Sequence, residues 1–417
     1  MSKIRIKNFG PLKEGFKETL PDGSVNDWLD VKKVTVFIGN QGSGKSVVAK
    51  LISTFTWMEK ALTRGDYEKR HFERKGNFVN QRLTYHRLEN YFLRDKDAVL
   101  DYRGHSFNFH FENGNLTIED ARNGQYPLPQ IMYVPADRNF IANVRTPKAL
   151  KQITPSLSEL VTEMINAGLT MKAPMSLPIN DEVYVEYNRL NDIFYLKGKD
   201  YRIKLSEASS GFQSIVPLFL ISWYLSDSVK KYSENEKELM SSDERERFRK
   251  RFKEINENTS LTEEQRRIAI SELGKGFNKT AFINIVEEPE QNLFPSSQRG
   301  MLNSLLDFNN INTGNKLVVT THSPYLINYL TLSVEAHKLK TKVNNNELRQ
   351  RLNKIIPLNS TVNADDLVIY QLNESDGSIT KLKTYKGLPS DENYLNKGLE
   401  ESNNLFSELL DIEDLCQ

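Results

Sequence analysis

The chain has 417 residues, and its 56 lysines and arginines nearly balance its 55 aspartates and glutamates, so the formal net charge is +1. This balance excludes a global electrostatic attraction to nucleic acid or to a membrane surface, so any such patch must be local. A single cysteine excludes an internal disulfide framework and a cysteine-based metal cluster. No stretch approaches the roughly 20 apolar residues that span a bilayer, and the N-terminus lacks a signal-peptide core. We therefore expect a cytoplasmic location and no membrane partner.

Short apolar, β-branched runs alternate with helical patterns along the chain, which predicts an α/β fold with a mixed or parallel sheet. Helical insertions are expected at about 61–97 and 227–279, a helical lobe at about 140–226, and hairpins around 112–115 and 192–204. The chain divides into a head, 1–332, and a C-terminal extension, 333–417, with a strand pair and an acidic amphipathic helix. The expected strands are 3–8, 31–38, 131–134, 281–286, 316–320, 367–372 and 379–385.

A glycine-rich loop at residues 39–46 follows one predicted strand directly and precedes a helical pattern. It matches the phosphate-binding pattern GxxxxGK[ST], in which glycines let successive backbone N–H groups surround phosphate oxygens at a helix N-terminus. We therefore predict that the loop binds ATP, that Lys45 reaches the β and γ phosphates, and that Ser46 ligates Mg²⁺. The predicted nucleotide ligands here are Gly39, Asn40, Gln41, Gly42, Ser43, Gly44, Lys45, Ser46 and Val47.

A second apolar strand ends in two adjacent carboxylates, Glu287 and Glu288. The C-terminal edge of a strand is where a doubly wound sheet binds ligands. We predict that Glu287 holds Mg²⁺ together with Ser46, and that Glu288 orients and deprotonates the attacking water. By itself such an acidic turn is typical of a solvated loop, and the glycine-rich loop favours the catalytic interpretation. His322 follows a third strand and is predicted to contact the γ-phosphate.

A serine and glycine segment at residues 209–213 opens a strongly apolar helix. Alone it is typical of an ordinary helix N-cap. Serine hydroxyls and glycine N–H groups at a helix N-terminus also form a phosphate-binding surface, and one glycine-rich loop needs only one such surface. The spare surface predicts a head-to-tail homodimer with two ATP molecules between the copies. Its predicted nucleotide ligands are Ser209, Ser210, Gly211 and Gln213.

These motifs, in this order, resemble the ABC ATPase superfamily over about residues 1–332, and within it the soluble OLD, RecF and SMC relatives. The resemblance implies an ABC-type ATPase head. It assigns the Walker A loop to residues 39–46 and the signature to residues 209–213. By the same resemblance Glu287 is the Walker B acid, Glu288 is the catalytic glutamate and His322 is the switch histidine. The predicted catalytic residues are therefore Lys45, Glu288 and His322.

Two positions depart from the family pattern. Ala136 stands where the family's Q-loop glutamine is expected, and either Asp137 or Arg138 substitutes for it or Arg138 forms a structural ion pair; the sequence leaves both readings open. Phe294 ends a stretch where many relatives carry an aspartate-ended D-loop. These departures lead us to expect slow turnover.

The sequence supports three functional hypotheses. The first rests on a resemblance to ATPase subunits of phage-defence systems of the PtuA and AriA types. ATP-driven dimerisation or higher assembly would there switch or hold a separately encoded effector, a nuclease or a toxin. The second is a RecF- or SMC-like repair ATPase that binds DNA through basic segments 64–74 or 138–151. The third is a nucleotide-stabilised scaffold with little turnover.

The C-terminal extension adds two further expectations. Its acids Asp365, Asp366 and Asp376 lack nuclease spacing and are typical of turns and caps, so we expect no appended nuclease domain. Its final helix suits either the docking of a partner or the closing of the domain, which the sequence leaves undecided. The apolar residues of that helix are Leu399, Leu405, Phe406, Leu409, Leu410 and Ile412.

Overall fold

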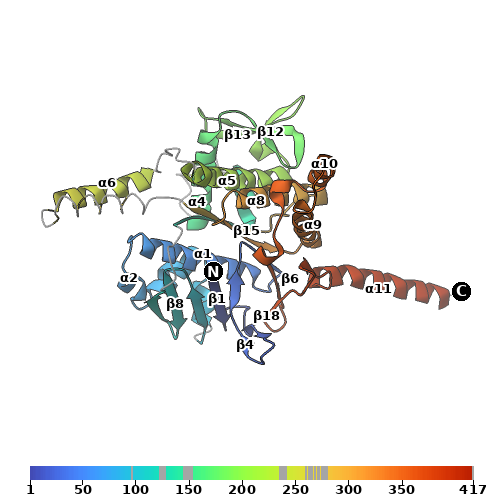
Figure 1. Ribbon diagram of the computed structural model, residues 1–417, viewed down its shortest axis with the longest axis horizontal. Helices are drawn as coiled ribbons and strands as arrows, with labels where there is room; N and C mark the ends of the chain where they lie inside the picture. Colours follow the sequence, from blue (N-terminus) through green and yellow to red (C-terminus); the bar gives the residue numbers. More distant parts are fainter. Residues whose placement is uncertain are drawn as a thin grey trace.

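The computed structural model describes residues 1–94, 97–121, 128–143, 154–233, 242–258, 261, 266, 269, 273 and 280–415. The body is built around a seven-stranded sheet, and a C-terminal helix extends away from it (Figure 1). The fold is α/β, as expected from the alternation of strand and helix patterns. Among the described residues, no helix combines the length and the apolar run needed to cross a membrane.

The central sheet has the order β10-β15-β16-β6-β17-β18-β2. The first five strands of this order are parallel to one another, β18 is antiparallel to β17, and β2 is parallel to β18. Parallel neighbours place their carboxyl ends at one edge of the sheet. The strands are β10 (Pro129–Val134), β15 (Ala281–Glu287), β16 (Lys316–Thr321), β6 (Val34–Gly39), β17 (Leu367–Leu372), β18 (Ser378–Lys381) and β2 (Gly15–Phe16).

Both faces of the central sheet are buried, each against a core of its own. Side chains along a strand alternate between the two faces, so neighbouring residues enter different cores. On β6, Val36 and Ile38 join the core shared with α4, α5, α8 and α9, whereas Phe37 joins the core shared with α1 and the antiparallel sheet. These helices are α1 (Lys45–Thr63), α4 (Pro155–Thr170), α5 (Ser210–Ser233), α8 (Pro295–Asn310) and α9 (Pro324–Lys340).

The remaining strands form smaller antiparallel sheets. The five-stranded sheet has the order β5-β1-β7-β8-β9, and the expected turn at 112–115 joins β8 to β9 with Asn113 at φ 51° and Gly114 at φ 78°. The second expected hairpin is part of a four-stranded sheet, β11-β12-β13-β14. The bounds are β1 (Ser2–Lys7), β3 (Glu18–Thr19), β4 (Val25–Asn26), β5 (Leu29–Val31), β7 (Val99–Arg103), β8 (Phe107–Glu112), β9 (Asn115–Asp120), β11 (Met175–Leu177), β12 (Asn180–Asn188), β13 (Ile193–Lys197), β14 (Arg202–Lys204), β19 (Thr384–Tyr385) and β20 (Leu388–Pro389).

Shorter helices occupy the regions where helical insertions are expected. Part of the second expected insertion, 227–279, is outside the described residues, and its described helix is α6. The bounds are α2 (Lys69–Glu73), a π-helix (Phe78–Leu83), α3 (Glu89–Arg94), α6 (Ser242–Glu257), α10 (Asn346–Ile355), α11 (Tyr394–Leu415) and 3₁₀ turns at Ala136–Asn143, Leu205–Glu207, Leu358–Ser360 and Ala364–Asp366.

Most of the C-terminal extension is built into the body. The expected division at 332/333 falls inside α9, and β17 pairs directly with β6, the strand that leads into the glycine-rich loop. Tyr370 on β17 stacks on Phe37 with ring centroids 5.6 Å apart, and its hydroxyl accepts a hydrogen bond from the backbone N–H of Asp30 at 2.8 Å. The second expected strand, 379–385, is divided between β18 and β19.

Candidate functional site

The glycine-rich loop connects β6 to α1 and is shaped by glycines with positive φ. A Cβ atom on Gly44, at φ 97°, would lie 2.7 Å from Cδ2 of Leu12, and one on Gly39 would lie 2.4 Å from the carbonyl oxygen of Leu372. Helix α1 begins at Lys45 with no side-chain hydrogen bond at its N-cap. The N–H groups of the first turn of α1 therefore face the loop, which is the arrangement that binds phosphate.

Lys45 is held within this loop. Its ammonium donates hydrogen bonds to the carbonyl oxygens of Gly39 and Asn40, both at 2.8 Å. Burial lowers the pKa of Lys45, while the carboxylates of Glu288 and Glu290 act in the opposite direction. The lysine is thus a buried cation facing acidic groups at the predicted phosphate position.

An unexpected acidic residue also reaches the loop. Glu374, in the turn between β17 and β18, accepts a hydrogen bond from the side-chain amide of Asn40 at 3.0 Å, and this bond lowers the pKa of Glu374. No local pattern in the sequence connects two residues so far apart. The contact follows from the pairing of β17 with β6, in which Leu372 lies opposite Gly39.

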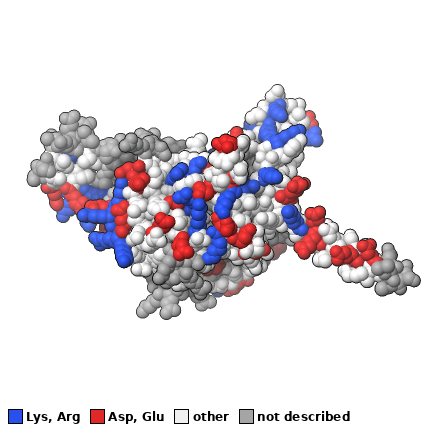
Figure 2. Space-filling model, turned by 90° about the horizontal axis from the view of Figure 1, so that it is seen from below, with Lys and Arg blue, Asp and Glu red and all other residues white. Residues whose placement is uncertain are grey.

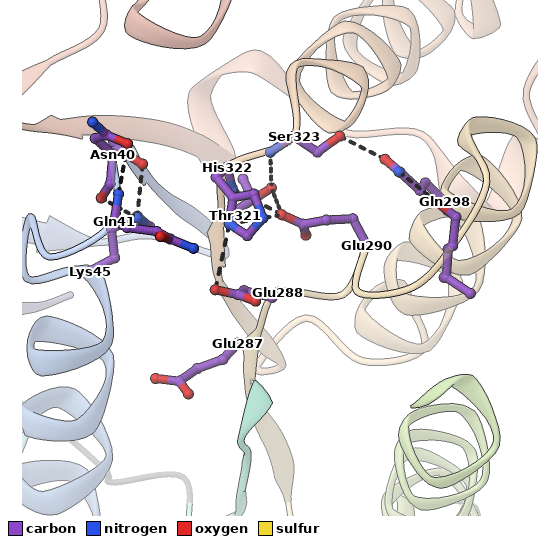
Figure 3. A network of polar contacts seen from close by, with 12 residues as sticks. Asn40, Gln41, Lys45, Glu287, Glu288, Glu290, Gln298, Thr321, His322 and Ser323 are labelled. Atoms are coloured by element: carbon purple, nitrogen blue, oxygen red, sulfur yellow. Dashed lines mark hydrogen bonds and ion pairs between the residues drawn. The ribbon is translucent and has the colours of Figure 1, made fainter. Parts of the chain in front are cut away.

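The two predicted carboxylates, Glu287 and Glu288, lie at the end of β15, next to β16, and make different contacts (Figure 3). Glu287 is buried; its Oε2 accepts a hydrogen bond from the backbone N–H of Ala136 at 3.3 Å, whereas its Oε1 has no partner. The hydroxyls of Ser43 and Thr320 are also buried and without a hydrogen-bond partner. These oxygens are available to water or to a polar ligand.

These donors suit Mg²⁺ bound together with phosphate. Mg²⁺ prefers oxygen ligands and keeps several waters, so one carboxylate and one hydroxyl suffice when phosphates supply the rest. Glu287 and Ser46 are the oxygen donors that the prediction assigned to this role. Within the described part of the chain, no group of three or more His, Cys, Asp and Glu side chains is arranged to hold a metal ion by itself.

Glu288 and His322 face one another across the ends of β15 and β16 (Figure 3). The distance from Nδ1 of His322 to Oε1 of Glu288 is 3.5 Å. This contact raises the pKa of the imidazole and lowers the pKa of the Glu288 carboxyl. Glu288 has φ 45°, a backbone conformation that is strained for a residue with a side chain. The strain indicates that the fold holds this carboxylate in a set position.

Glu290 is a site residue to which the sequence analysis gave no role. It is buried, and its Oε1 accepts hydrogen bonds from the Thr321 hydroxyl at 2.6 Å and from the backbone N–H of His322 at 2.9 Å. Its Oε2 has no partner. Glu290 therefore orients the turn that carries His322 and adds a second carboxylate 3.9 Å from its Nδ1.

The predicted signature lies at the N-terminus of α5, beside the turn that follows Glu290. Ser209 and Ser210 are exposed. A Cβ atom on Gly211 would lie 2.8 Å from the carbonyl oxygen of Asn292, so a glycine is needed for this close approach. The amide of Gln213 donates to the carbonyl oxygens of Ser206 and Ala208 in its own loop. Among the described residues, no hydrogen bond or ion pair joins the signature to Lys45.

Arg138 links α5 to the end of β15. Its guanidinium is fully buried and donates to the carbonyl oxygens of Ser214 at 3.0 Å, Pro135 at 3.2 Å, Glu287 at 2.7 Å and Glu288 at 2.7 Å. Burial lowers its pKa to about 10, although the nearby carboxylates act in the opposite direction. Arg138 is therefore structural, as one of the two readings held, but its partners are backbone carbonyls and not the carboxylate of an ion pair.

Comparison with known protein families supports an ATPase domain. The family described as AAA ATPase domain matches residues 141–327. That stretch contains the signature, the acidic end of β15 and His322, and it excludes the glycine-rich loop. No curated protein matches the chain. The family match and the loop geometry together support a P-loop ATPase.

Similar solved structures include an SMC head domain from Thermotoga maritima, with 10% identity, a TM-score of 0.35 and coverage of 92% of this chain and 98% of that one. An Smc head domain with an extended coiled coil, bound to the C-terminal domain of ScpA from Pyrococcus furiosus, has 10% identity, a TM-score of 0.33 and coverage of 98% and 100%. An ATP-binding cassette in a dimeric, post-hydrolysis state bound to ADP and phosphate has 11% identity, a TM-score of 0.28 and coverage of 92% and 100%. TM-scores of this size do not establish the fold, which rests on the sheet order described above.

Replacing Glu288 with Gln should lower the pKa of His322. The carboxylate supplies the largest interaction that raises this pKa, and burial, which lowers it, remains in the variant. While Glu288 is ionised, the charged pair stabilises the folded state in full at pH values below the ordinary histidine pKa of 6.5. This contribution is lost as the pH rises through the raised pKa of His322, and also as the pH falls through the lowered pKa of Glu288. Titration of the His322 ring by NMR in the nucleotide-free wild type and variant measures the change. An unchanged pKa would show that the pair does not form in solution.

Replacing Arg138 with Met should lower the free energy of unfolding by at least about 3 kcal/mol, because each buried carbonyl left without a donor costs about 1–3 kcal/mol. Arg138→Lys retains a charge and part of the bonding, so its loss should be smaller. Urea denaturation measures both variants. Equal stability of Arg138→Met and the wild type would contradict the structural role.

Proposed function

We propose that this protein is an ABC-type ATPase in which two copies close head to tail around two ATP molecules. The observation that carries this proposal is the exposed Ser209 and Ser210 edge at the start of α5. The edge combines hydroxyls with the N–H groups of a 24-residue helix, which suits a phosphate. The P-loop of the same chain already has its own helix N-terminus, so the signature edge is available to the nucleotide of a second copy.

The side chains of one active site would then divide the work of hydrolysis. Lys45 and the α1 N-terminus neutralise the phosphates. Ser46 and Glu287 would hold Mg²⁺, which when bound would supply Lewis-acid polarisation of the γ-phosphoryl group. Glu288 accepts a proton from the attacking water. His322, which faces Glu288 in this structure, donates to the γ-phosphate. Its movement from the carboxylate to the phosphate frees Glu288 to act as a base.

Arg138 supplies a physical route between dimer closure and catalysis. The same guanidinium bonds to Ser214 in the signature helix and to the backbone of Glu287 and Glu288. A displacement of α5 when Ser210 meets a phosphate is therefore carried to the backbone of the catalytic carboxylate. Shared sites shift the equilibrium towards the closed dimer because they are complete only in that state.

We further propose that the closed dimer switches or holds a separately encoded effector, a nuclease or a toxin, in anti-phage defence. This step rests on the resemblance of the motif set to defence ATPase subunits, and fold-level analogy is its only support. The nucleotide-driven dimer itself rests on residues of this chain and is tested first.

Glu288→Gln should form a stable dimer in the presence of ATP and Mg²⁺, because closure proceeds while water activation is lost. Phosphate release should fall at least about 100-fold, the usual size of a general-base contribution. Size-exclusion chromatography with light scattering measures the mass, and a phosphate assay measures turnover. The matched control is Glu288→Gln combined with Lys45→Ala, which should remain open. At a protein concentration where the nucleotide-free protein is monomeric, a mass that ATP does not change in Glu288→Gln would refute the dimer. Wild-type turnover that Lys45→Ala abolishes would exclude the low-turnover scaffold.

A DNA-binding ATPase is the second candidate function, and one surface favours it. A groove between the end of α1 and α6 is lined by five basic side chains and two acids. Asp66 pairs with Arg64, Arg247 and Arg251, and the remaining excess of positive charge is what would attract a phosphate backbone. Its charged lining residues are Lys60, Arg64, Asp66, Arg247, Lys250, Arg251 and Glu254. In the other predicted basic segment, Arg138 is buried and bonded, and residues 144–151 lie outside the described residues.

If this groove binds DNA, replacing Arg247 and Lys250 with Glu should weaken binding of a fluorescent duplex at least tenfold, and raised salt should weaken wild-type binding in the same direction. Fluorescence anisotropy with the ATP-bound Glu288→Gln protein is the measurement. Replacement of the exposed Lys383 on another surface serves as the charge control. Wild-type protein that shows no salt-sensitive binding would remove this candidate.

A further inference from the structure

Helix α11 is attached to the body at its first residues and then leaves it. The backbone N–H of Tyr394 donates to the side chain of Gln371 on β17 at 3.0 Å, and Leu395 packs against the core. From Glu400 to Glu413 every residue is exposed. Figures 1 and 2 show the helix as an arm extending from the body. The helix therefore does not close the domain, which was one of the two expectations for it.

The arm carries a broad apolar face that its own chain leaves uncovered. Five large apolar side chains fall on this face at helical spacing, and each is 45–62% exposed. A contiguous apolar surface of this kind is typical of an interaction site. The five are Leu405, Phe406, Leu409, Leu410 and Ile412.

The arm is also strongly acidic. It carries six acids and one basic residue, Lys397, and Figure 2 shows the acids alternating with uncharged side chains along it. Glu401 and Glu408, seven residues apart, follow one edge of the apolar face. Two such arms placed face to face would repel one another, so the charge favours a basic surface as the partner. The six acids are Glu400, Glu401, Glu408, Asp411, Glu413 and Asp414.

The chain displays a complementary surface on α9 and α10. On α10, Leu348 is 47% exposed and Ile355 is 55% exposed, and the helical period places Arg349 and Arg351 on either side of them. Both arginines are exposed, and neither is among the described residues that make an ion pair or a side-chain hydrogen bond. On α9, to which α10 is attached, Leu332 and Leu339 are also exposed.

This basic surface is firmly attached to the body. Leu352 and Ile356 are buried against Ala336 of α9 in a small apolar cluster of their own. The α10 helix is therefore held by one face while Leu348, Ile355 and the two arginines remain exposed. A fixed apolar surface with basic edges suits an acidic amphipathic helix.

We propose that α11 of one copy lies on the α9 and α10 surface of a second copy, with Glu401 and Glu408 beside Arg349 and Arg351. The helix has 22 residues and is about 33 Å long, which allows it to reach another molecule. Reciprocal exchange of the two arms makes a closed pair. This interface goes beyond the proposed nucleotide sandwich: it uses other residues and forms without ATP.

The apolar contact is tested with the nucleotide-free, full-length protein. We expect a concentration-dependent dimer by light scattering, and Leu409→Asp should raise its dissociation constant at least tenfold. Asn404→Asp, on the opposite side of the same helix, adds the same charge and should leave the dissociation constant within twofold. A wild type that is monomeric at every concentration, or a dimer that Leu409→Asp leaves intact, would overturn the proposal.

The choice of partner surface is tested by charge reversal. Glu401→Lys with Glu408→Lys should weaken the dimer, as should Arg349→Glu with Arg351→Glu, and mixing the two variants should restore association in a heterodimer. If Leu409→Asp dissociates the dimer but neither charge reversal changes it, α11 does not occupy the basic surface and the assignment fails. ATP-dependent closure of Glu288→Gln should persist when Leu409→Asp is added, so the failure of one interface is distinguishable from the failure of the other.

Discussion

The parallel register of β6, β16 and β15 is the constraint on which the site depends. It places Ile38 opposite Thr321 and Thr320 opposite Glu287. The candidate site residues of three chain segments therefore lie at one edge of the sheet. No single segment contains a nucleotide site. The glycine-rich loop, the carboxylates and His322 become one site only because the hydrogen bonds of the sheet hold the strand ends level.

Charge at this edge is concentrated and mostly buried. Glu287 and Glu290 each have an oxygen with no hydrogen-bond partner, while Lys45 and Arg138 are cations drawn into the same region. Burial disfavours charged forms, and opposite charges favour them. The balance leaves buried carboxylate oxygens that can accept water or coordinate a cation. Arg138 adds rigidity, because its bonds join the signature helix to the catalytic backbone.

The C-terminal residues play two different parts. Through β17 they extend the central sheet next to β6, and Glu374 in the following turn contacts the glycine-rich loop. Through α11 they leave the body altogether. The change occurs after Tyr394, which bonds to Gln371, and Leu395, which packs against the core. The large apolar side chains from Leu405 to Ile412 are exposed. One short segment thus belongs to the nucleotide-binding core, and the next is suited to contact with another molecule.

The sequence by itself determined the α/β class, the strands that matter and the identity of the glycine-rich loop. These are local properties: hydrophobic period, glycine spacing and a helix after a strand all lie within about ten residues. It also placed Glu288 and His322 correctly at strand ends, since a strand's direction is visible in its flanking residues. The turn at 112–115 was predictable for the same reason.

Only the tertiary structure decided what depends on distant partners. Arg138 was readable as an ion pair because arginine usually seeks carboxylates, yet its four acceptors are carbonyls from three separate segments. Glu374 reaches Asn40 across 334 residues of sequence, and the exposure of α11 depends on which surfaces pack elsewhere. A sequence pattern shows which face of a helix is apolar, but whether that face is covered is settled only when the remaining elements have been placed in space.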